Sequence, residues 1–309
     1  MKSIKGKHLV WLQDWSPEEI ETVLQTAITM KAAFLSGVRP QPLSGKTLAM
    51  VFAKPSTRTR VSFEVAMTQL GGHAIYLGTG DLQLGRGETI ADTARVLSGF
   101  CDAIMIRTFA QRDVEDLARY SRVPVINGLS DLVHPCQILS DMLTIIEKKG
   151  KLAGIRLAFV GDGNNVCHSW ILGGTKMGME IRVATPEGYE PNPEIVEMGR
   201  ESAERYGGNL VLTRDPAHAV RDADVVYTDV WTSMGQEKER DERLKAMQAY
   251  QVNMKLFAGA DKNAIFMHCL PAHRGEEVTD EIADGPMSVI FDQAENRLHL
   301  QKALLSLVM

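Results

Sequence analysis

The stretch from Lys54 to Arg60, KPSTRTR, places hydroxyl and guanidinium groups directly after the apolar run TLAMVF at 47–52. The apolar run predicts a strand, and the periodicity that follows it predicts a helix. The residues expected in or beside the first helical turn are Ser56, Thr57, Arg58 and Thr59. Unpaired backbone N–H groups and the positive end of the helix dipole favour an anion at that turn. With the hydroxyls and the Arg58 fork they predict a phosphate site, the alternative being an ordinary serine cap beside solvated arginines.

Further polar side chains follow other apolar runs, at the expected carboxyl ends of strands, where open α/β sheets bind ligands. Arg107 ends the run DAIMIR, and His134 and Gln137 follow the run VINGLSDLV. His134 and Gln137 stand three residues apart at an expected helix start, so both are placed to face one small carbonyl group. The alternative for a lone histidine is a structural role.

The second half of the chain contains FVGDGNNV at 159–166, part of which matches a dinucleotide-binding loop. Gly161 and Gly163 fit that fingerprint, but Val166 stands where the third glycine belongs. No acidic residue follows the next strand at the usual spacing. A nicotinamide cofactor, and with it a dehydrogenase, is therefore disfavoured.

Two more clusters follow later apolar runs. The segment DVWTSMG from Asp229 to Gly235 combines a carboxylate, a hydroxyl and a glycine-flanked backbone N–H, with an ordinary Asp-Ser helix cap as the alternative. His268 and Cys269 end the run AIFMH, with His273 close by. These three side chains are one ligand short of a closed zinc site. Neighbours in an extended segment point opposite ways, so His268 is poorly placed to act as the base for a Cys269 nucleophile.

These residues need a scaffold that gathers the ends of strands. Short β-like runs alternate with helical patterns up to about residue 150, and the alternation restarts with IRLAFVG and continues to AIFMHCLP. This order predicts an α/β fold with two domains, each a mainly parallel β-sheet flanked by helices. We expect a first domain at 1–150 and a second at 151–309, with a C-terminal helix at about 291–309 that packs back on the first. SPEE at 16–19 predicts a capped helix start.

Composition narrows the partners. The 309 residues carry a net charge of −5 with both signs interspersed and without a basic tract, so we expect no nucleic acid partner. No apolar run approaches the ~20 residues that span a bilayer, so we expect no membrane partner. The four cysteines form no CxxC pair, which predicts neither a disulfide framework nor a structural zinc site, and favours a cytoplasmic location.

Five motifs together resemble the aspartate/ornithine carbamoyltransferase family, and within it the ornithine enzymes. The motifs are Ser56-Thr57-Arg58-Thr59-Arg60, His134-Pro135-Cys136-Gln137, DVWTSMG at 229–235, His268-Cys269-Leu270-Pro271 and FDQAENR at 291–297. They stand in the family's order, and the resemblance runs over nearly the whole chain. It implies transfer of the carbamoyl group of carbamoyl phosphate to the δ-amino group of L-ornithine, giving L-citrulline and phosphate. It also implies that no metal and no organic cofactor takes part.

The resemblance implies a role for each matching residue. Those implied to bind carbamoyl phosphate are Ser56, Thr57, Arg58, Thr59, Gln83, Arg107, His134, Gln137 and Arg297. Those implied to bind ornithine are Asn165, Asp229, Ser233, Met234, Cys269 and Leu270. Those assigned to catalysis are Arg107, His134, Cys269 and Asp229, with the hypothesis that Cys269, tuned by Asp229 or His268, helps to remove the amine proton. Gln83 matches a residue that reaches into a neighbouring subunit's site, which implies a homotrimer or a multiple of trimers.

Rival functions make different demands on the sequence. An aspartate carbamoyltransferase needs a cation to bind the side-chain carboxylate of aspartate. Enzymes that resemble the aspartate type usually carry an arginine just after the Leu-Pro pair, where this chain has Ala272. Putrescine would leave Ser233 and Met234 without a carboxylate and an amine to hold. A lysine-type or N-acetylated acceptor stays open, because the sequence does not give the depth of the pocket. A non-catalytic phosphate sensor on the same fold would be favoured by the loss of Arg58, His134 or Cys269, and all three are present.

Overall fold

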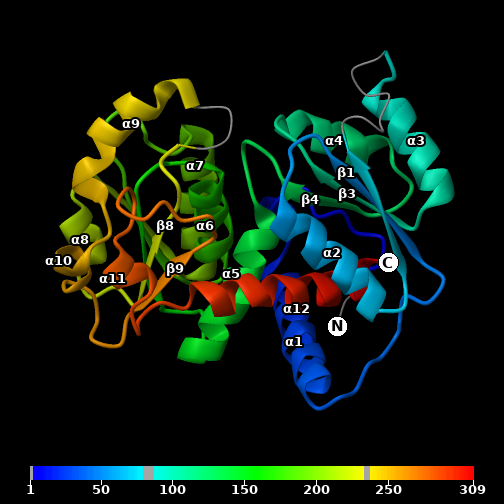
Figure 1. Cartoon of the computed structure of the whole chain (residues 1–309), viewed down its shortest axis with the longest axis horizontal. Coiled ribbons are helices and arrows are strands. Elements are labelled where there is room, and N and C mark those ends of the chain that lie inside the picture. The colour runs from blue at the N-terminus through cyan, green and yellow to red at the C-terminus, as the bar shows by residue number, and fades with distance from the viewer. Residues whose placement is uncertain (1–2, 79–86, 233–236) are drawn as a thin grey trace. The chain divides into compact units, whose positions relative to one another are not determined.

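The chain folds into two compact units (Figure 1). The computed structural model describes residues 3–78, 87–232 and 237–309. Unit 1 contains Met1–Leu143 and Glu295–Met309, and unit 2 contains Thr144–Ala294. The division lies before the expected position near residue 150, because one helix, α5 (Pro135–Lys149), continues from the first unit into the second.

Unit 1 is built on a parallel sheet with the strand order β2-β1-β3-β4. The elements that begin in it are η1 (Leu12–Asp14), α1 (Pro17–Leu35), β1 (Thr47–Phe52), α2 (Thr57–Gln69), β2 (His73–Gly78), α3 (Ile90–Phe100), β3 (Ala103–Arg107), α4 (Gln111–Tyr120), β4 (Val125–Leu129) and α5. The chain passes from β1 to β2 on one side and then crosses to β3 on the other. The order therefore reverses between β1 and β3, which is where open α/β sheets form ligand crevices.

Helices cover both faces of this sheet. Helices α3 and α4 pack on one face over apolar residues of β1 and β3, and α2 and α12 (Ile290–Val308) lie on the other side (Figure 1). Two side-chain bonds fasten the C-terminal helix to unit 1: Lys31 Nζ donates to Asn296 Oδ1 at 2.8 Å, and Lys302 Nζ donates to Gln69 Oε1 at 2.9 Å. Arg297, on the same helix, is thereby held within this unit.

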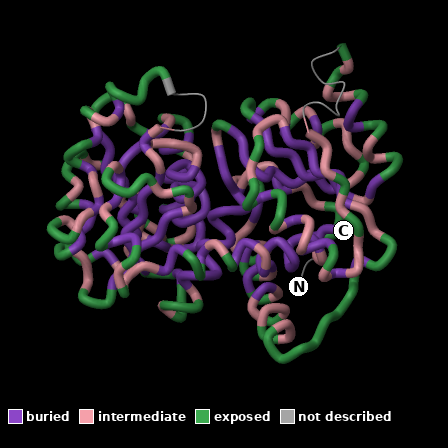
Figure 2. The backbone as a smooth tube through the Cα atoms, in the orientation of Figure 1, coloured by how far each residue is buried: buried purple, intermediate pink, exposed green. Residues whose placement is uncertain are grey.

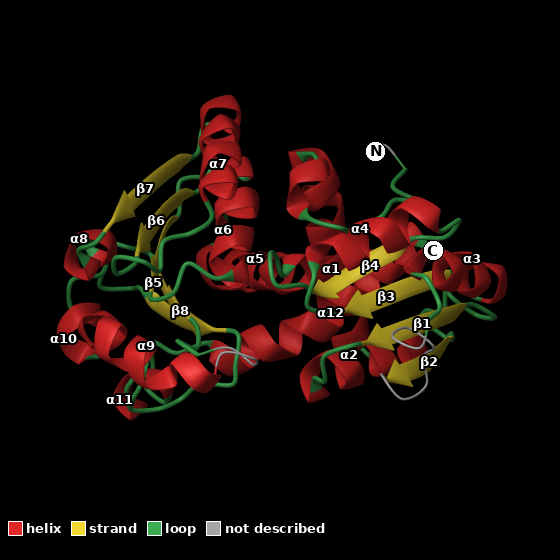
Figure 3. Cartoon of the chain, turned by 90° about the horizontal axis from the view of Figure 1, so that it is seen from above, coloured by secondary structure: helices red, strands yellow, loops and turns green. Residues whose placement is uncertain are grey.

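Unit 2 contains a second parallel sheet with the order β7-β6-β5-β8-β9. Its elements are β5 (Arg156–Val160), α6 (Asn165–Lys176), β6 (Glu180–Ala184), α7 (Pro193–Tyr206), β7 (Asn209–Thr213), α8 (Pro216–Val220), β8 (Val225–Thr228), η2 (Glu237–Glu239), α9 (Arg240–Met247), η3 (Gln248–Tyr250), α10 (Met254–Phe257), β9 (Ile265–His268), α11 (Asp280–Ala283) and the start of α12. Helices α6 and α7 lie on one face, and α8 and α10 on the other (Figure 3). The strand order reverses between β5 and β8.

The sequence patterns explain these elements. Strands β1, β3 and β8 are mostly apolar because parallel strands inside a sheet are buried on both faces, and Figure 2 shows them as largely buried. At α1 the expected capping box is present, with Ser16 Oγ accepting from Glu19 N and the Glu19 carboxylate accepting from Ser16 N. The predicted fold class, two parallel-sheet domains flanked by helices, is confirmed. Among the described residues no helix is both long and apolar enough to cross a membrane.

Candidate active site

The predicted anion site lies at the first turn of α2. Ser56 is the N-cap residue, and its Oγ accepts from Thr59 N at 3.3 Å. The Ser56 hydroxyl also donates to Thr59 Oγ1 at 3.2 Å. Thr57 is the first helical residue and, like Arg58, is exposed, whereas Thr59 is fully buried. The turn therefore presents the N–H groups of a helix start, an exposed hydroxyl and an exposed guanidinium.

The C-terminal helix adds a second arginine to this turn. Arg297 Nη2 donates to Thr59 Oγ1 at 2.9 Å, although the two residues are 238 positions apart in the chain. The Arg297 side chain is buried. A guanidinium at this place adds a positive charge to a helix N-terminus, which already favours an anion.

Arg107 reaches the same edge of the sheet from the end of β3. It is paired in register with Phe52, the last residue of β1, so it lies beside the strand that leads into α2. The register with β4 shifts between Ile106 and Arg107. Such irregularities re-aim side chains at the edges of sheets and near active sites. Arg107 is buried and brings a further positive charge to this edge of the sheet.

His134 lies among these cations and is uncharged. Burial lowers its pKa well below the usual value, and Arg297, Arg107, Arg58 and Lys54 lower it further because each repels a positive imidazole. At neutral pH its ring therefore acts as a neutral hydrogen-bond group. A neutral imidazole surrounded by cations can donate to a carbonyl oxygen without adding charge.

Cys136, close to His134 in the chain, is a structural thiol. Burial raises its pKa to about 12, and its Sγ donates to the Asn127 carbonyl at 3.3 Å. Burial likewise raises the pKa of Cys167 and of Cys101. These thiols stay protonated and are poor nucleophiles.

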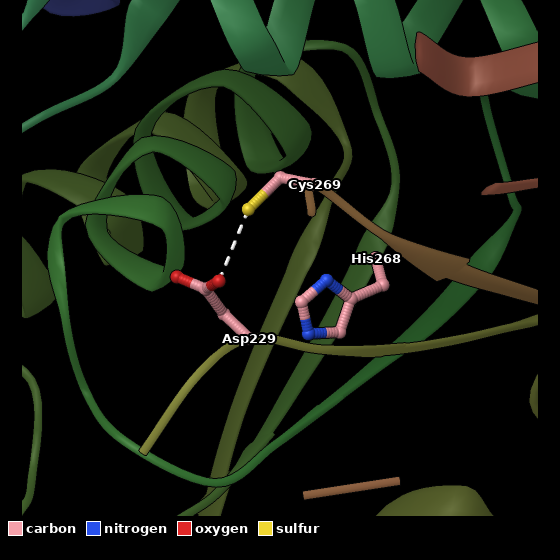
Figure 4. Close-up of side chains that lie close together, drawn as sticks. All are labelled: Asp229, His268 and Cys269. Carbon is pink, nitrogen blue, oxygen red and sulfur yellow. Dashed lines mark hydrogen bonds between the residues drawn. The ribbon is translucent and has the colours of Figure 1, made fainter. Parts of the chain in front are cut away.

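In unit 2, Asp229 is the centre of a polar cluster at the ends of β5, β8 and β9. Its Oδ1 accepts from Cys269 Sγ at 3.0 Å, and its Oδ2 accepts from Asn164 Nδ2 at 2.8 Å. Figure 4 shows the Cys269 thiol pointing at the Asp229 carboxylate. Asn164 also caps α6, its Oδ1 accepting from Val166 N and Cys167 N, which fixes the amide that holds Asp229. Asp229 is buried, so it suits an ammonium group as its counter-ion.

His268 braces the segment that carries Cys269 and Leu270. Its Nδ1 accepts from Leu270 N at 2.9 Å, so the proton of the neutral ring is on Nε2, which lies 3.2 Å from Glu277 Oε1. Both ring nitrogens are therefore occupied, and the ring cannot take a proton from Cys269. Leu270 has a φ of 59°, a conformation that residues with a Cβ rarely adopt. The hydrogen bond to His268 therefore holds Leu270 in an uncommon backbone conformation, which also sets the direction of its carbonyl.

The GDGNNV loop is closed by the chain itself. A Cβ at Gly163 would lie 2.3 Å from Pro191 N and 2.7 Å from the Tyr189 carbonyl oxygen, so residues 189–191 cover the loop. In a dinucleotide-binding fold the pyrophosphate needs that approach. The structure thus agrees with the sequence in disfavouring a nicotinamide cofactor.

Two groups of side chains have metal-ligand chemistry among the described residues. Ligand atoms of Asp229, His268 and Cys269 lie within 4.8 Å of one another, as do those of His273, Glu276 and Glu277. In the first group the Cys269 thiol bonds to Asp229, and His268 Nδ1 accepts from a backbone N–H. The present geometry is that of a hydrogen-bonded cluster.

Comparison with known proteins decides the family. A model described as "Aspartate/ornithine carbamoyltransferase, carbamoyl-P binding domain" matches residues 7–147, and one described as "Aspartate/ornithine carbamoyltransferase, Asp/Orn binding domain" matches residues 153–308. The chain belongs to the aspartate/ornithine carbamoyltransferase family. The resemblance inferred from five sequence motifs is confirmed.

Relatives in this family are similar over their full length. The ornithine carbamoyltransferase of Pyrococcus horikoshii is 60% identical over 307 residues, covering 99% of this chain and 97% of that protein. That of Symbiobacterium thermophilum is 56% identical over 309 residues, covering 100% of both. The solved ornithine carbamoyltransferase of Pyrococcus furiosus superimposes with a TM-score of 0.98 at 59% identity, covering 100% of this chain and 99% of that one.

The structure gathers most of the family's expected site residues into two clusters, one in each unit. Unit 1 brings together Ser56, Thr57, Arg58, Thr59, Arg107, His134, Gln137 and Arg297 at one edge of its sheet. Unit 2 brings together Asp229, Cys269 and Leu270, with Asn165 as the first residue of α6. Gln83, Ser233 and Met234 lie outside the described residues.

Sequence reasoning missed several members of these clusters. Lys54 belongs to the quoted KPSTRTR stretch, and its charge acts on His134. Asn164, the neighbour of the expected Asn165, makes a bond to Asp229. Glu277 holds His268 from nine positions away in sequence. Lys54 and Asn164 had a visible signal, since both stand in stretches singled out in the sequence, whereas Glu277 had none.

Proposed function

We propose that this chain transfers the carbamoyl group of carbamoyl phosphate to the δ-amino group of L-ornithine, releasing L-citrulline and phosphate. The observation that carries the choice of ornithine is Asp229, a buried carboxylate beside Cys269, together with full-length relatives that bear the name ornithine carbamoyltransferase. An α-amino group needs such a counter-ion. An aspartate acceptor would need a cation for its side-chain carboxylate, and Ala272 stands at the position where enzymes that resemble the aspartate type usually carry arginine.

In this proposal unit 1 binds the phosphate donor. The first turn of α2, with Ser56, Thr57, Arg58 and Thr59, holds the phosphate, and Arg297 neutralises it from the other side. Arg107 bridges the phosphate and the carbonyl, and His134 and Gln137 orient the carbamoyl group. The support is the positive charge that converges on a neutral His134.

Unit 2 binds the amino acid in this proposal. Asp229 and Ser233 hold the α-amino group, and Asn165 with the Met234 backbone holds the α-carboxylate. Cys269 and the Leu270 carbonyl face the δ-amine. The support for the second pair is local, because His268 and Glu277 fix the backbone on which Cys269 and Leu270 lie.

The chemistry is acyl transfer. The neutral δ-amine attacks the carbonyl carbon, a tetrahedral oxyanion forms, and the C–O bond to phosphate breaks. Arg107, His134 and Thr59 stabilise the oxyanion. The δ-ammonium must first lose one proton, which at pH 7 costs roughly 4 to 5 kcal/mol for a group with a pKa of ~10.4. A second proton leaves the attacking nitrogen and goes to the departing phosphate.

The Cys269–Asp229 pair assists the first proton loss, which releases the δ-ammonium proton to solvent. The geometry supports Asp229 as the group that tunes Cys269, because Cys269 Sγ donates to it while His268 is engaged elsewhere. The chain also works as a homotrimer or a multiple of trimers, with Gln83 of one subunit completing the site of the next. It is cytoplasmic, and its free cysteines agree with a reducing compartment.

One assay tests the reaction. The purified chain is incubated with carbamoyl phosphate and, separately, ornithine, aspartate, putrescine, lysine or N-acetylornithine, and the ureido product is measured. We expect product with ornithine far above the other acceptors. The variant Asp229→Asn should raise the KM for ornithine without weakening carbamoyl phosphate binding by calorimetry. Faster turnover with aspartate, or no uptake of carbamoyl phosphate, would overturn the proposal.

A further inference from the structure

Helix α5 carries a buried carboxylate that the proposed reaction has not used. Asp141 is fully buried, and its Oδ1 accepts from Gln137 Nε2 at 2.8 Å. Gln137, one helical turn earlier, is also buried. Both residues lie in the part of α5 that belongs to unit 1, close in sequence to His134.

This bond determines which way the Gln137 amide points. Gln137 Nε2 donates to Asp141 Oδ1, so the NH₂ end of the amide faces Asp141 and the oxygen faces away. The reverse orientation would bring two acceptors together. Asp141 lies toward the carboxyl end of α5, so Gln137 Oε1 is turned toward the amino end of the helix, where His134 lies. Among the described residues, Gln137 Oε1 has no hydrogen-bond partner.

A helix-stabilising role alone does not account for this pair. A Gln–Asp pair at i,i+4 contributes only ~0.2–0.5 kcal/mol to a helix, and surface positions would supply it. An unpaired buried amide oxygen carries a cost. A ligand that brings an N–H donor to Gln137 Oε1 would remove that cost.

We propose that Asp141 is a positioning residue for donor selectivity, because it fixes Gln137 so that an acceptor oxygen meets the NH₂ of the carbamoyl group. This inference rests on the proposed function and deepens it. Acetyl phosphate has a methyl group at that position and offers no donor. The phosphate and the carbonyl of both donors would be bound alike by the α2 turn, Arg107 and His134. Asp141 therefore acts only on the part of the ligand that distinguishes the two.

The test compares two ligands in each variant. The KM for carbamoyl phosphate is measured with saturating ornithine, and the inhibition constant of acetyl phosphate is measured as its competitor. In Asp141→Leu we expect the KM for carbamoyl phosphate to rise about five- to tenfold, the worth of one neutral hydrogen bond, while the inhibition constant stays unchanged. Asp141→Asn should lie closer to wild type, because its side-chain oxygen can still accept from Gln137.

A polarity swap gives a second test that keeps two polar side chains at this place. Gln137→Glu alone puts two carboxylates together and should impair carbamoyl phosphate binding more than Asp141→Asn alone. In the double variant the amide introduced at position 141 can donate to the carboxylate introduced at position 137. The second oxygen of that carboxylate again faces the carbamoyl NH₂, so we expect the double variant to recover selectivity for carbamoyl over acetyl phosphate. Should Asp141→Leu fail to fold, the double variant decides. Recovered selectivity for carbamoyl over acetyl phosphate supports the inference, and no recovery overturns it.

Ser140→Ala serves as the matched control. Ser140 is buried on the same helix turn and its hydroxyl donates to the Cys136 carbonyl at 2.8 Å, so its loss reports on helix integrity alone. Equal weakening of carbamoyl and acetyl phosphate in the Asp141 variants would show a merely structural role and overturn the inference. No change in either constant would also overturn it. Failure of wild type to make citrulline would instead refute the proposed function.

Discussion

At the scale of single residues, a buried guanidinium joins three segments of unit 2. Arg243 Nη1 donates to Asp162 Oδ2 at 3.1 Å and to the Trp231 carbonyl at 3.2 Å. Its Nε donates to Glu239 at 3.0 Å. The pKa of Asp162 is raised to about 6, chiefly by burial and in part by Asp229 and Glu239, against the opposing effect of Arg243. Asp162 therefore gains a proton as pH falls through about 6, and its bond to Arg243 weakens.

This titration predicts a pH dependence of ornithine binding. Trp231 stands two residues after Asp229, so loosening Arg243 disturbs the segment that carries the proposed ammonium partner. We expect the KM for ornithine to rise about fivefold from about pH 7 to about pH 5, as one charged hydrogen bond weakens. Initial rates at saturating carbamoyl phosphate measure it. Asp162→Asn should show the raised KM at every pH, and an inflection near pH 6 that survives in this variant contradicts the assignment.

The same shift has a consequence for stability. The pKa of Asp162 in the folded chain lies above the usual 3.8, so the protonated form is the one that folding favours. Its stabilising contribution is present at acid pH and is lost as pH rises through about 6. Relative to Asp162→Asn, wild type should therefore gain stability in urea unfolding as pH falls from about 7 to about 4.

Cys269 offers a second prediction at this scale. Its thiol donates to Asp229 in the cluster that faces the proposed δ-amine, so Cys269→Ser should lower kcat about tenfold or more and shift the pH profile. Rates are compared across pH at saturating substrates. Cys101→Ser is the matched control, since Cys101 is a buried thiol of unit 1 outside the proposed site. A Cys269→Ser profile that superimposes on wild type would refute the proton-loss role.

The residue scale is also where sequence analysis was least complete. The serine cap that the sequence offered as the alternative at Ser56 is present, because cap chemistry is local; its predicted role in phosphate binding stays a prediction. Arg243 was missed because its partner Asp162 is 81 positions away, and the sequence around each residue gives no sign of the pairing. Asp141 was missed for a different reason. Its spacing of four residues from Gln137 is visible in the sequence, but its importance depends on burial, which is not.

At the scale of elements, the predicted strands and helices that bear on the site were found, and their order within the sheets was not predicted. Apolar runs and helical periodicity fix where an element lies, because each must bury one face or both. The strand orders β2-β1-β3-β4 and β7-β6-β5-β8-β9 depend on how the elements pack. Those orders place the first turn of α2 and Arg107 at the reversal between β1 and β3. They place Asn164 and Asp229 at the reversal between β5 and β8.

Ser56 is proposed both to cap α2 and to bind the phosphate, and substitution of two serines can separate these roles. Ser56 and Ser16 each cap a helix of unit 1 by accepting from the backbone N–H three residues later. Each Ser→Ala change should cost about 1 kcal/mol of stability in urea unfolding. Ser56→Ala should also raise the KM for carbamoyl phosphate about tenfold, since it removes a proposed ligand of the phosphate. An equal effect of Ser16→Ala on that KM would mean that stability, not ligation, controls binding.

At the scale of the whole molecule, the exposed apolar side chains of unit 1 support association. Phe100 is 79% exposed on α3, Val61 is 51% exposed on α2, and Phe109 is 51% exposed after β3. Helices α2 and α3 cover opposite sides of the sheet, so these side chains lie on different faces of unit 1 and each is available to a different contact between subunits. The proposed trimer would cover such side chains, and a closed ring would bring each subunit beside the next one's site.

A shared site makes a quantitative prediction. If each site uses Arg107 of one subunit and Gln83 of the next, Arg107→Ala and Gln83→Ala subunits are each inactive alone. Every mixed ring, however, contains one place where a Gln83→Ala subunit is followed by an Arg107→Ala subunit. The site at that place has Arg107 from the former and Gln83 from the latter, so it is intact. Random assembly of equal amounts makes three quarters of the rings mixed, with one intact site in three, so co-expression should restore roughly a quarter of wild-type activity.

The measurement uses two purification tags, so that only rings holding both variants are assayed for citrulline. Those rings should then show roughly a third of the wild-type rate, since one site in each is intact. The control pairs Arg107→Ala with His134→Ala, both proposed to act within one subunit's own site. That mixture cannot rebuild a site in any arrangement and should stay inactive. The two pairings differ only in the residue changed in the second variant, Gln83 or His134. Equal rates in both would therefore place Gln83, like His134, in the site of its own subunit.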